Sequence, residues 1–524
     1  MPATADLLAV VAGLPQGRVV LPGLDSGLDD DSWAALGETH PQFGMAQLLE
    51  RLDVARADVL PWGGKGDAAR LALAREVMRP EATAHAWADL RHLDAAAASD
   101  GLSRIECDDS RAEAGVIALL MRETLETPGR TAALVTPDRD LARRVRAELG
   151  RWDIAVDDSA GRPLAETMPG TFLRLSLDAL QEDLAPVPLL SLLKHPLAAG
   201  AEKRVAFRAR SRELERACLR GPRPGPGFAG LRRALGKHKG LRTWLKPLEE
   251  AASPLLRRLK RKKPVALADL VREHLAFAEW LASDDLGDGA NALWQGEAGH
   301  AAATLFEQLL AAAEGLQPIA AAEYPALIEA LLARAVVRPR SGVHPRLAIW
   351  GPLEARLQHA DRIILGGLVE ASWPGEVAAD PWLSRPMRKA FGLPLPERAV
   401  GLAAHDFAQL FCAPEAVLTR AQKAEGTPTV PSRWLVRLDT VLDGAGGADI
   451  IRDPLWMQWH TALDMPDEPP RPLAPPEPCP PVAARPRKLS VTRIERWMRD
   501  PYDIYARHIL GLSPLDPIDA ALGP

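Results

Sequence analysis

The clearest hydrophobic pattern in this chain is a short apolar run followed by an amphipathic segment. Residues 132–135 are all apolar, Thr136 can cap a helix, and an apolar residue then recurs every four positions at Leu141, Val145 and Leu149. A buried strand followed by a helix with one apolar stripe is the repeating unit of a parallel α/β sheet. Further strands of such a sheet are predicted at residues 171–177, 346–352 and 362–368, and a short buried strand that ends in a Pro/Gly/Asp loop is predicted at residues 17–25.

The spacing of apolar residues becomes helical between about residues 200 and 340. Segments 268–282 and 326–337 both carry apolar positions three and four residues apart. Because strand-like runs lie on both sides of this region, the sequence predicts an α/β domain that is interrupted by a large helical insertion.

A proline-rich stretch separates this domain from the last part of the chain. Ten of the 21 residues at 466–486 are proline, which excludes a helix or a central strand and predicts a stiff, extended linker. Beyond it, Ser490 or Thr492 can cap an amphipathic helix that carries Ile494 and Trp497. This helix is expected to open a further module.

Composition places the chain among globular proteins of three or four domains. Of its 524 residues, 47% are hydrophobic and 25% are charged. The four cysteines form no CxxC pair, which argues against a zinc knuckle or a disulfide framework. No run of about 18 uncharged apolar residues is present to span a membrane. We therefore expect a cytoplasmic protein without membrane contact.

Positive charge is concentrated in one segment. The net charge is −5, yet residues 202–263 contain 20 Lys or Arg against 5 Asp or Glu. Such a segment either meets an anionic partner or is a solvated face, and both interpretations stay open. If it follows a nucleic-acid backbone, affinity should fall steeply with salt. The densest basic patch consists of Arg257, Arg258, Lys260, Arg261, Lys262 and Lys263.

Several sequence signatures of catalysis are missing. The chain has no GxxxxGK[ST] loop for ATP phosphates, and none of its 12 lysines follows an Asp or Glu by two residues, as the (D/E)xK nuclease motif requires. GxSxG and HExxH are absent as well. The adjacent His405 and Asp406 would point about 100° apart on a helix, so packing or capping is favoured over catalysis. No catalytic, metal-binding or cofactor-binding residue is assigned.

Arginine and aromatic residues gather in the last third of the α/β region. Arginine side chains beside exposed aromatic rings suit phosphate contact and base stacking. Structural alternatives stay open, because Trp373 and Trp434 can be core anchors and Arg385 and Arg388 can cap helix ends. The stretches concerned are EASWPGE around Trp373, residues 380–401 and residues 418–435.

The order of these segments resembles one family closely, the AddB subunits of the bacterial helicase-nuclease that processes double-strand DNA breaks, in their alphaproteobacterial form. The match runs along the whole chain. The segments that carry it are PATADLL at 2–8, VVLPGLD at 19–25, HPQFG at 40–44, LVTPDRDLARRV at 134–145, DDSAGRPL at 157–164, LLKHPLAAG at 192–200, the blocks 350–374 and 380–407, LTRAQKAEGTPTVPSRWL at 418–435, and SVTRIERWMRDPYDIYARHIL at 490–510.

This family is similar to the UvrD-like superfamily one helicases, which implies a helicase-type parallel α/β domain. By that resemblance, Arg420 stands where active motors place an arginine finger, and residues 366–374 correspond to a strand and loop that contact DNA. Ala371 replaces a glycine of the family, a change that disfavours a loop with positive φ. Asp500 replaces the cysteine that iron-sulfur-bearing relatives carry, so no cluster is expected.

The resemblance also implies an order of segments. Family members begin with a longer ATPase-like domain and continue into a nuclease domain, so this chain is expected to be a fragment that lacks most of both. The expected segments are a remnant of the first helicase-like domain with a helical region (1–125), the first half of the second helicase-like α/β domain (126–200), a basic helical insertion (201–340), the second half of the α/β domain (341–450), the proline-rich linker (451–488) and a truncated nuclease-domain entry helix (489–524).

The function implied by the resemblance is to hold single-stranded DNA and scan it for a recombination hotspot. The implied partners are the AddA subunit and single-stranded and double-stranded DNA in the nucleoid, and ATP and magnesium are implied only for the intact complex. The alternatives are an active ATP-dependent helicase or exonuclease subunit, or a nonfunctional docking remnant of a broken gene. The residues expected to face the strand are Arg356, Trp373, Arg385, Arg388, Arg420, Lys423, Arg433 and Trp434.

Overall fold

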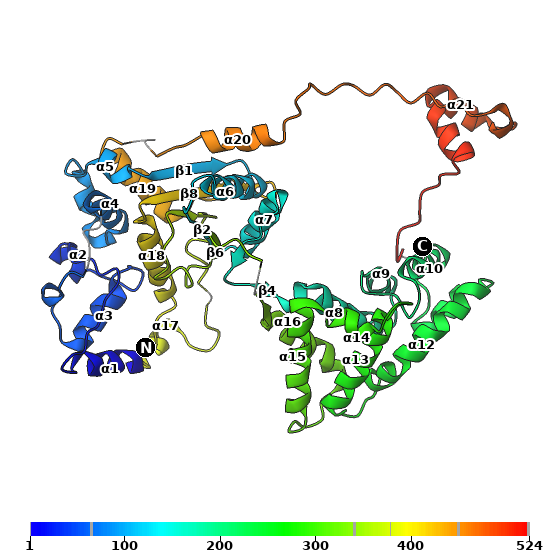
Figure 1. The fold of residues 1–524 in the computed structure, drawn as a ribbon, viewed down its shortest axis with the longest axis horizontal. Coiled ribbons are helices and arrows are strands. Elements are labelled where there is room, and N and C mark those ends of the chain that lie inside the picture. The colour runs from blue at the N-terminus through cyan, green and yellow to red at the C-terminus, as the bar shows by residue number, and fades with distance from the viewer. Residues whose placement is uncertain (1, 63–66, 339–341, 378, 448–450, 521–524) are drawn as a thin grey trace. The chain divides into compact units, whose positions relative to one another are not determined.

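The computed structural model describes residues 2–62, 67–338, 342–377, 379–447 and 451–520. Its contacts divide the chain into two compact units (Figure 1). The sheet unit contains residues 1–160 and 339–467, and the helical unit contains residues 161–338 and 468–524. The fold is therefore α/β with a large helical insertion, in agreement with the sequence prediction.

The sheet unit is built on six parallel strands in the order β1-β8-β7-β2-β6-β3. Every residue of β2 and β7 is buried, as expected for central strands that are covered on both faces. The predicted strands at 132–135, 346–352 and 362–368 are confirmed as β2, β6 and β7. The strands of this sheet are β1 Leu102–Cys107, β2 Ala132–Val135, β3 Asp157–Asp158, β6 Leu347–Trp350, β7 Arg362–Leu365 and β8 Glu415–Ala421.

Helices cover the sheet on both faces, each over a core of its own. One core joins Ile117 and Leu141 to the sheet residue Leu134, and the other joins Leu73 and Phe407 to Val135. The helices of this unit are α1 Pro2–Ala12, α2 Asp30–Ala34, α3 Phe43–Leu52, α4 Ala68–Met78, α5 Ala95–Ser99, α6 Ser110–Thr124, α7 Arg139–Leu149, α17 Arg385–Ala390, α18 Arg398–Phe411, α19 Arg433–Gly444 and α20 Leu455–Leu463.

The predicted stripe on α7 is confirmed, because Leu141, Val145 and Leu149 are all buried. The predicted cap is wrong by two residues. Asp138, and not Thr136, is the N-cap, and its carboxylate accepts the backbone N–H groups of the first helical turn.

The helical unit surrounds a single apolar core. A short antiparallel pair, β4 Arg162–Pro163 with β5 Val336–Val337, joins the two chain segments at its beginning and end. Its other elements are α8 Met168–Gln181, α9 Pro186–Leu193, α10 Arg204–Leu214, α11 Gly227–Ala234, α12 Lys239–Leu259, α13 Leu267–Ala282, α14 Gly289–Leu293, α15 Gly296–Ala313, α16 Tyr324–Arg334, α21 Val491–Arg499 and α22 Pro501–Ile504.

Two predicted strands are wrong. Residues 171–177 lie in α8, which Thr167 caps, and its buried residues Phe172, Leu173 and Leu177 follow a helical spacing. Because α8 packs in the helical core, that unit begins at residue 161, whereas the expected insertion begins at 201.

The second wrong strand is at residues 17–25, which form a loop. The Gln42 side chain holds this loop, since it donates to the carbonyl of Gly23 at 2.8 Å and accepts from the N–H of Asp25 at 3.0 Å. The side-chain amide thus replaces the pairing that a neighbouring strand would supply.

The proline-rich segment is extended, as expected. Residues 466–481 contain no helix or strand and are exposed almost throughout. After α21 and α22, the chain returns to the helical unit, where the N–H of Gly221 donates to the carbonyl of Pro517 at 2.9 Å. Within the described residues, no helix is long and apolar enough to cross a membrane.

Candidate nucleic-acid interface

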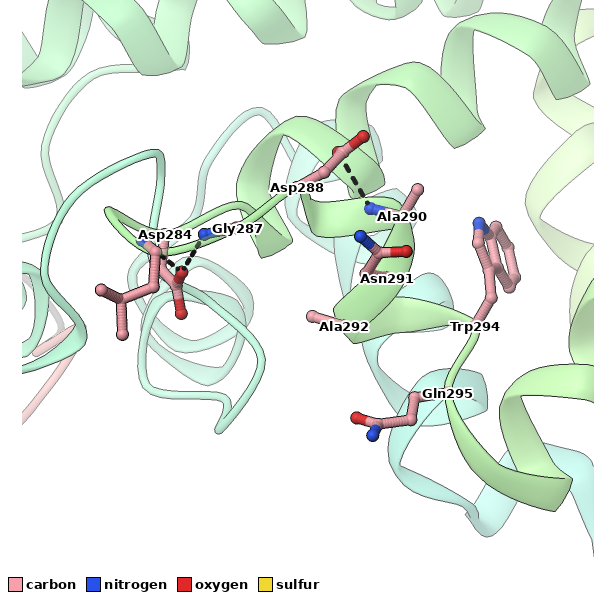
Figure 2. A pocket seen from close by; sticks show the side chains of 9 residues that line it. Asp284, Gly287, Asp288, Ala290, Asn291, Ala292, Trp294 and Gln295 are labelled. Carbon is pink, nitrogen blue, oxygen red and sulfur yellow. Dashed lines mark hydrogen bonds between the residues drawn. The ribbon is translucent and has the colours of Figure 1, made fainter.

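A wide surface depression of about 610 Å³ lies beside the loop that joins α13 to α15 (Figure 2). The two carboxylates that line it already have partners within the protein. Asp284 accepts the N–H groups of Leu286 and Gly287 and pairs with Arg204 at 3.0 Å, and Asp288 accepts the N–H of Ala290. The depression therefore follows from the turn geometry and brings no free titratable groups together.

A second cavity, of about 380 Å³, lies where the parallel strands end, the edge at which α/β sheets commonly bind ligands. Four carboxylates line it, those of Glu113, Asp138, Asp140 and Glu425, against the single guanidinium of Arg144. This excess of negative charge makes the edge unfavourable for a phosphate chain.

Glu113 is fully buried at this edge. It accepts hydrogen bonds from the N–H of Gly367 and the hydroxyl of Thr419, both at 2.8 Å. Burial nevertheless raises the pKa of its carboxyl to about 7. Through these two hydrogen bonds, Glu113 links the start of α6 to β8 and to the residues that follow β7.

The five arginines that sequence reasoning placed on the strand all have carboxylate partners. A phosphate would have to compete with these carboxylates for the guanidinium groups, so the five residues do not form a free cationic row. The pairs are Arg356 Nε with Asp406 Oδ1 at 2.6 Å, Arg385 Nε with Glu397 Oε1 at 2.5 Å, Arg388 Nη1 with Asp380 Oδ2 at 2.6 Å, Arg420 Nε with Glu106 Oε2 at 2.5 Å, and Arg433 Nε with Glu370 Oε1 at 3.1 Å.

The surroundings of Arg420 show why such an ion pair forms. The register of β1 and β8 places Glu106 directly opposite Arg420 on the neighbouring strand. Glu106 also accepts a hydrogen bond from Arg104 Nε at 2.8 Å, and Arg104 reaches Asp439 on α19. Arg420 is thus a cross-strand partner within the sheet, a geometry that does not resemble an extended arginine finger.

The two tryptophans that were predicted to stack on a DNA strand are core residues. Their rings are not exposed for that contact. Trp373 is 1% exposed and Trp434 is 3% exposed, and their rings meet edge to face at 6.1 Å. The indole N–H of Trp373 donates to the carbonyl of Gly366 at 3.1 Å. Buried rings with a satisfied N–H cannot stack on a base in this conformation. Lys423, by contrast, is exposed in β9 (Lys423–Ala424), which pairs with β10 (Thr427–Pro428).

The basic patch spans the last turn of α12 and the residues that follow it, and most of its side chains are exposed. Arg258 pairs with Asp269 at 2.9 Å, and Lys260 pairs with Asp183 at 2.5 Å. The remaining four side chains are exposed, and no described carboxylate lies within ion-pair distance of them. They are Arg257, Arg261, Lys262 and Lys263.

Sequence reasoning missed a second cationic feature, on α9 and α10. Arg208 and Arg212 lie one helical turn apart on α10 and, together with Lys194 at the end of α9, line a cavity of about 370 Å³. The available signal was an arginine at every fourth position from Arg204 to Arg216, because such a spacing places side chains on one side of a helix. We call this cavity, together with the three cationic side chains that line it, the cation cavity.

Comparisons with known proteins add little about activity. No family model matches the chain. An uncharacterized protein, RC0550, of Rickettsia conorii is 25% identical over 180 residues, a match that spans 33% of this chain and 19% of that protein. The similarity therefore covers a minor part of both proteins, and the name of the Rickettsia protein states no function.

Proposed function

We propose that this chain is the helicase-like, DNA-binding part of an AddB-type subunit, which holds and scans single-stranded DNA within a helicase-nuclease that processes double-strand breaks. The observation that carries the proposal is a strongly basic segment within a helical unit that is inserted into a parallel α/β sheet. The segment at 202–263, with its 20 basic and 5 acidic residues, lies entirely within that unit.

A nucleic-acid partner fits the placement of the charge. The exposed cations of the patch after α12 and of the cation cavity are solvent-facing side chains, several without carboxylate partners, and so retain their charge for phosphates. In the sheet unit the carboxyl edge is acidic and the five arginines expected to face the strand are paired, so these residues offer less free charge. We therefore assign the contact with the strand chiefly to the helical unit.

The proposed role is a noncatalytic one. AddA would supply ATP-driven movement along the DNA, and this chain would hold the separated strand, because it contains neither a GxxxxGK[ST] loop nor an (D/E)xK pair. A region that binds a backbone through cations needs no nucleotide of its own, which is consistent with this division of labour.

The test is binding of a fluorescein-labelled oligothymidine to the purified chain, followed by anisotropy between about 50 and 200 mM salt, with ATP hydrolysis measured in parallel. We expect log Kd to rise linearly with log salt concentration and hydrolysis to stay at background. Absence of binding at low salt would overturn the proposal and favour a docking role. DNA-stimulated hydrolysis would instead favour an active motor.

A further inference from the structure

The cation cavity places two arginines, neither with a carboxylate partner in the described part of the chain, one helical turn apart on α10, beside a lysine that is paired with Glu215. We infer that Lys194, Arg208 and Arg212 form a phosphate-binding site for the backbone of a nucleic-acid strand. The inference rests on the proposed function and assigns it a specific contact, at a place that no sequence motif marked.

The position of the two arginines is fixed by the packing of α10. Phe207, Ser211 and Leu214 are buried on one side of this helix, so Arg208 and Arg212 project from the adjoining side. Residues four apart are separated by about 6 Å along the helix axis, a spacing comparable to that of neighbouring phosphates on an extended strand. Neither arginine is within ion-pair distance of a carboxylate among the described residues.

Lys194 is held against this pair by a buried carboxylate. Its Nζ lies 2.5 Å from Glu215 Oε2, while the other oxygen of Glu215 accepts from Arg220 Nε at 2.9 Å. Although burial opposes it, the hydrogen bonds from Lys194 and Arg220 keep the pKa of Glu215 below its ordinary value. Glu215 therefore stays charged and orients the lysine, and Arg208 and Arg212 remain uncompensated.

The wider arrangement favours a strand over a small anion. The arginine spacing continues beyond the cavity in both directions, to Arg204 at the start of α10 and to Arg216 on the turn that follows it. Arg204 forms an ion pair with Asp284, whereas the Arg216 side chain is exposed. A row of guanidinium groups suits a repeating polyanion, since successive phosphates can each meet one cation.

The test compares two double variants of the full chain with equal loss of charge. Arg208→Gln with Arg212→Gln removes two cations of the cavity. Arg210→Gln with Arg242→Gln removes two exposed cations of the same region, where Arg210 lies beside Gly240 of α12 and Arg242 near the carbonyl of Gly236. Circular dichroism establishes that both variants keep the helical content of the parent.

We expect the cavity variant to bind oligothymidine roughly tenfold more weakly and its salt slope to fall by about 1.4, from two phosphate contacts at about 0.7 each. The control variant should lose less than about threefold in affinity and keep its slope. Equal losses in the two variants would overturn the assignment, because the effect would then be one of overall charge. If the parent chain binds no DNA, the proposed function itself fails.

A competition experiment separates nucleic acid from other polyanions. Unlabelled oligothymidine should displace the labelled strand from the parent chain. Polyglutamate at the same charge concentration should displace it far less, because its carboxylates lie at the ends of flexible side chains that lose rotamer freedom on binding, whereas the phosphates belong to the backbone of the strand. Equal displacement by polyglutamate would overturn the nucleic-acid assignment and favour an acidic protein surface as the partner.

Discussion

Ala371 shows how a single residue stores a conformational cost. Its φ is +70°, in the left-handed region that disfavours any side chain with a Cβ atom. Alanine in place of glycine is expected to disfavour such a loop, yet the backbone adopts this conformation. The loop is fixed by the Trp373 indole in the core and by the contact of Glu370 with Arg433, and the alanine follows its neighbours.

We predict that Ala371→Gly stabilises the protein by about 1 kcal/mol, because glycine adopts a positive φ without the Cβ clash. The measurement is the urea midpoint of unfolding. Ala462→Gly is the matched control, since Ala462 is exposed within α20 and glycine in a helix costs about 1 kcal/mol. Midpoints that fall in both variants would contradict the predicted strain at residue 371.

The two tryptophans show what sequence could not decide at the residue scale. Trp373 and Trp434 stand beside arginines and prolines, a context that suits either a stacking platform or a core anchor, and only the three-dimensional packing against Phe407 separates the two. The role of the arginines could not be decided from sequence either. Sequence identifies a positive charge, but the carboxylates that neutralise it, such as Asp406 for Arg356, lie far away in the chain.

At the scale of elements, α12 combines great length with an unfavourable composition. It spans 21 residues and contains Pro247 and Pro254 in its interior. Each proline removes a backbone hydrogen bond and crowds the preceding turn. The helix persists because Leu241, Leu245 and Leu248 are buried in the core of the helical unit, so that tertiary packing outweighs local propensity.

We predict that Pro247→Ala raises the free energy of unfolding by about 2 kcal/mol, since alanine restores a hydrogen bond in an exposed helix interior. Pro386→Ala is the control, because Pro386 lies in the first turn of α17, where proline costs little. Its effect should stay within about 0.5 kcal/mol. A similar change in both variants, measured by urea unfolding, would show that the interior position of Pro247 is not the cause.

Element prediction succeeded where the pattern was unambiguous. The apolar run of β2 and the Ile363–Leu365 run of β7 are short and rich in apolar residues, which is typical of buried strands, and the four-residue spacing on α7 is typical of a helix. It failed at residues 171–177, because apolar residues that alternate over a short window also fit part of a helix. The deciding information lay outside that window, in the Thr167 cap and in the continuation of α8 to Gln181.

At the scale of the whole molecule, buried titratable groups divide unevenly between the two units. The helical unit contains His195 and His274, and burial lowers the pKa of each to about 4. In the sheet unit, burial likewise lowers the pKa of His40 to about 4, whereas it raises that of Glu113 to about 7. In the sheet unit the shifts of His40 and Glu113 oppose each other. In the helical unit the two histidines act in the same direction, and the half-buried Asp178, whose pKa burial raises, acts against them.

We predict that mild acid destabilises the helical unit preferentially. Between about pH 6.5 and 4 an unfolded histidine binds a proton that the native one does not, so each contributes a loss of roughly 2 kcal/mol at pH 5. Below pH 7, the protonated Glu113 is favoured in the native state and offsets the loss from His40 in the sheet unit. Hydrogen-exchange mass spectrometry at pH 7.5 and 5, corrected for intrinsic exchange, should show lost protection mainly in residues 161–338.

His195→Asn tests the cause of this acid sensitivity, because asparagine keeps an acceptor for the N–H of Leu197 and does not titrate. It should reduce the acid-dependent loss, whereas His300→Asn, at an exposed position, should leave the loss unchanged. Uniform loss of protection across both units would contradict the prediction.

The antiparallel pair of β4 and β5 closes the helical excursion at its base. The strands on either side of the excursion, β3 and β6, are immediate neighbours in the sheet, and the excursion leaves and returns through two paired residues on each strand. Residues 161–338 therefore behave as one closed insertion, since the two ends of the excursion already lie side by side and its addition costs the sheet unit little loop entropy. The same architecture makes this position tolerant of exchange, so that surfaces of different charge could be swapped on an unchanged sheet.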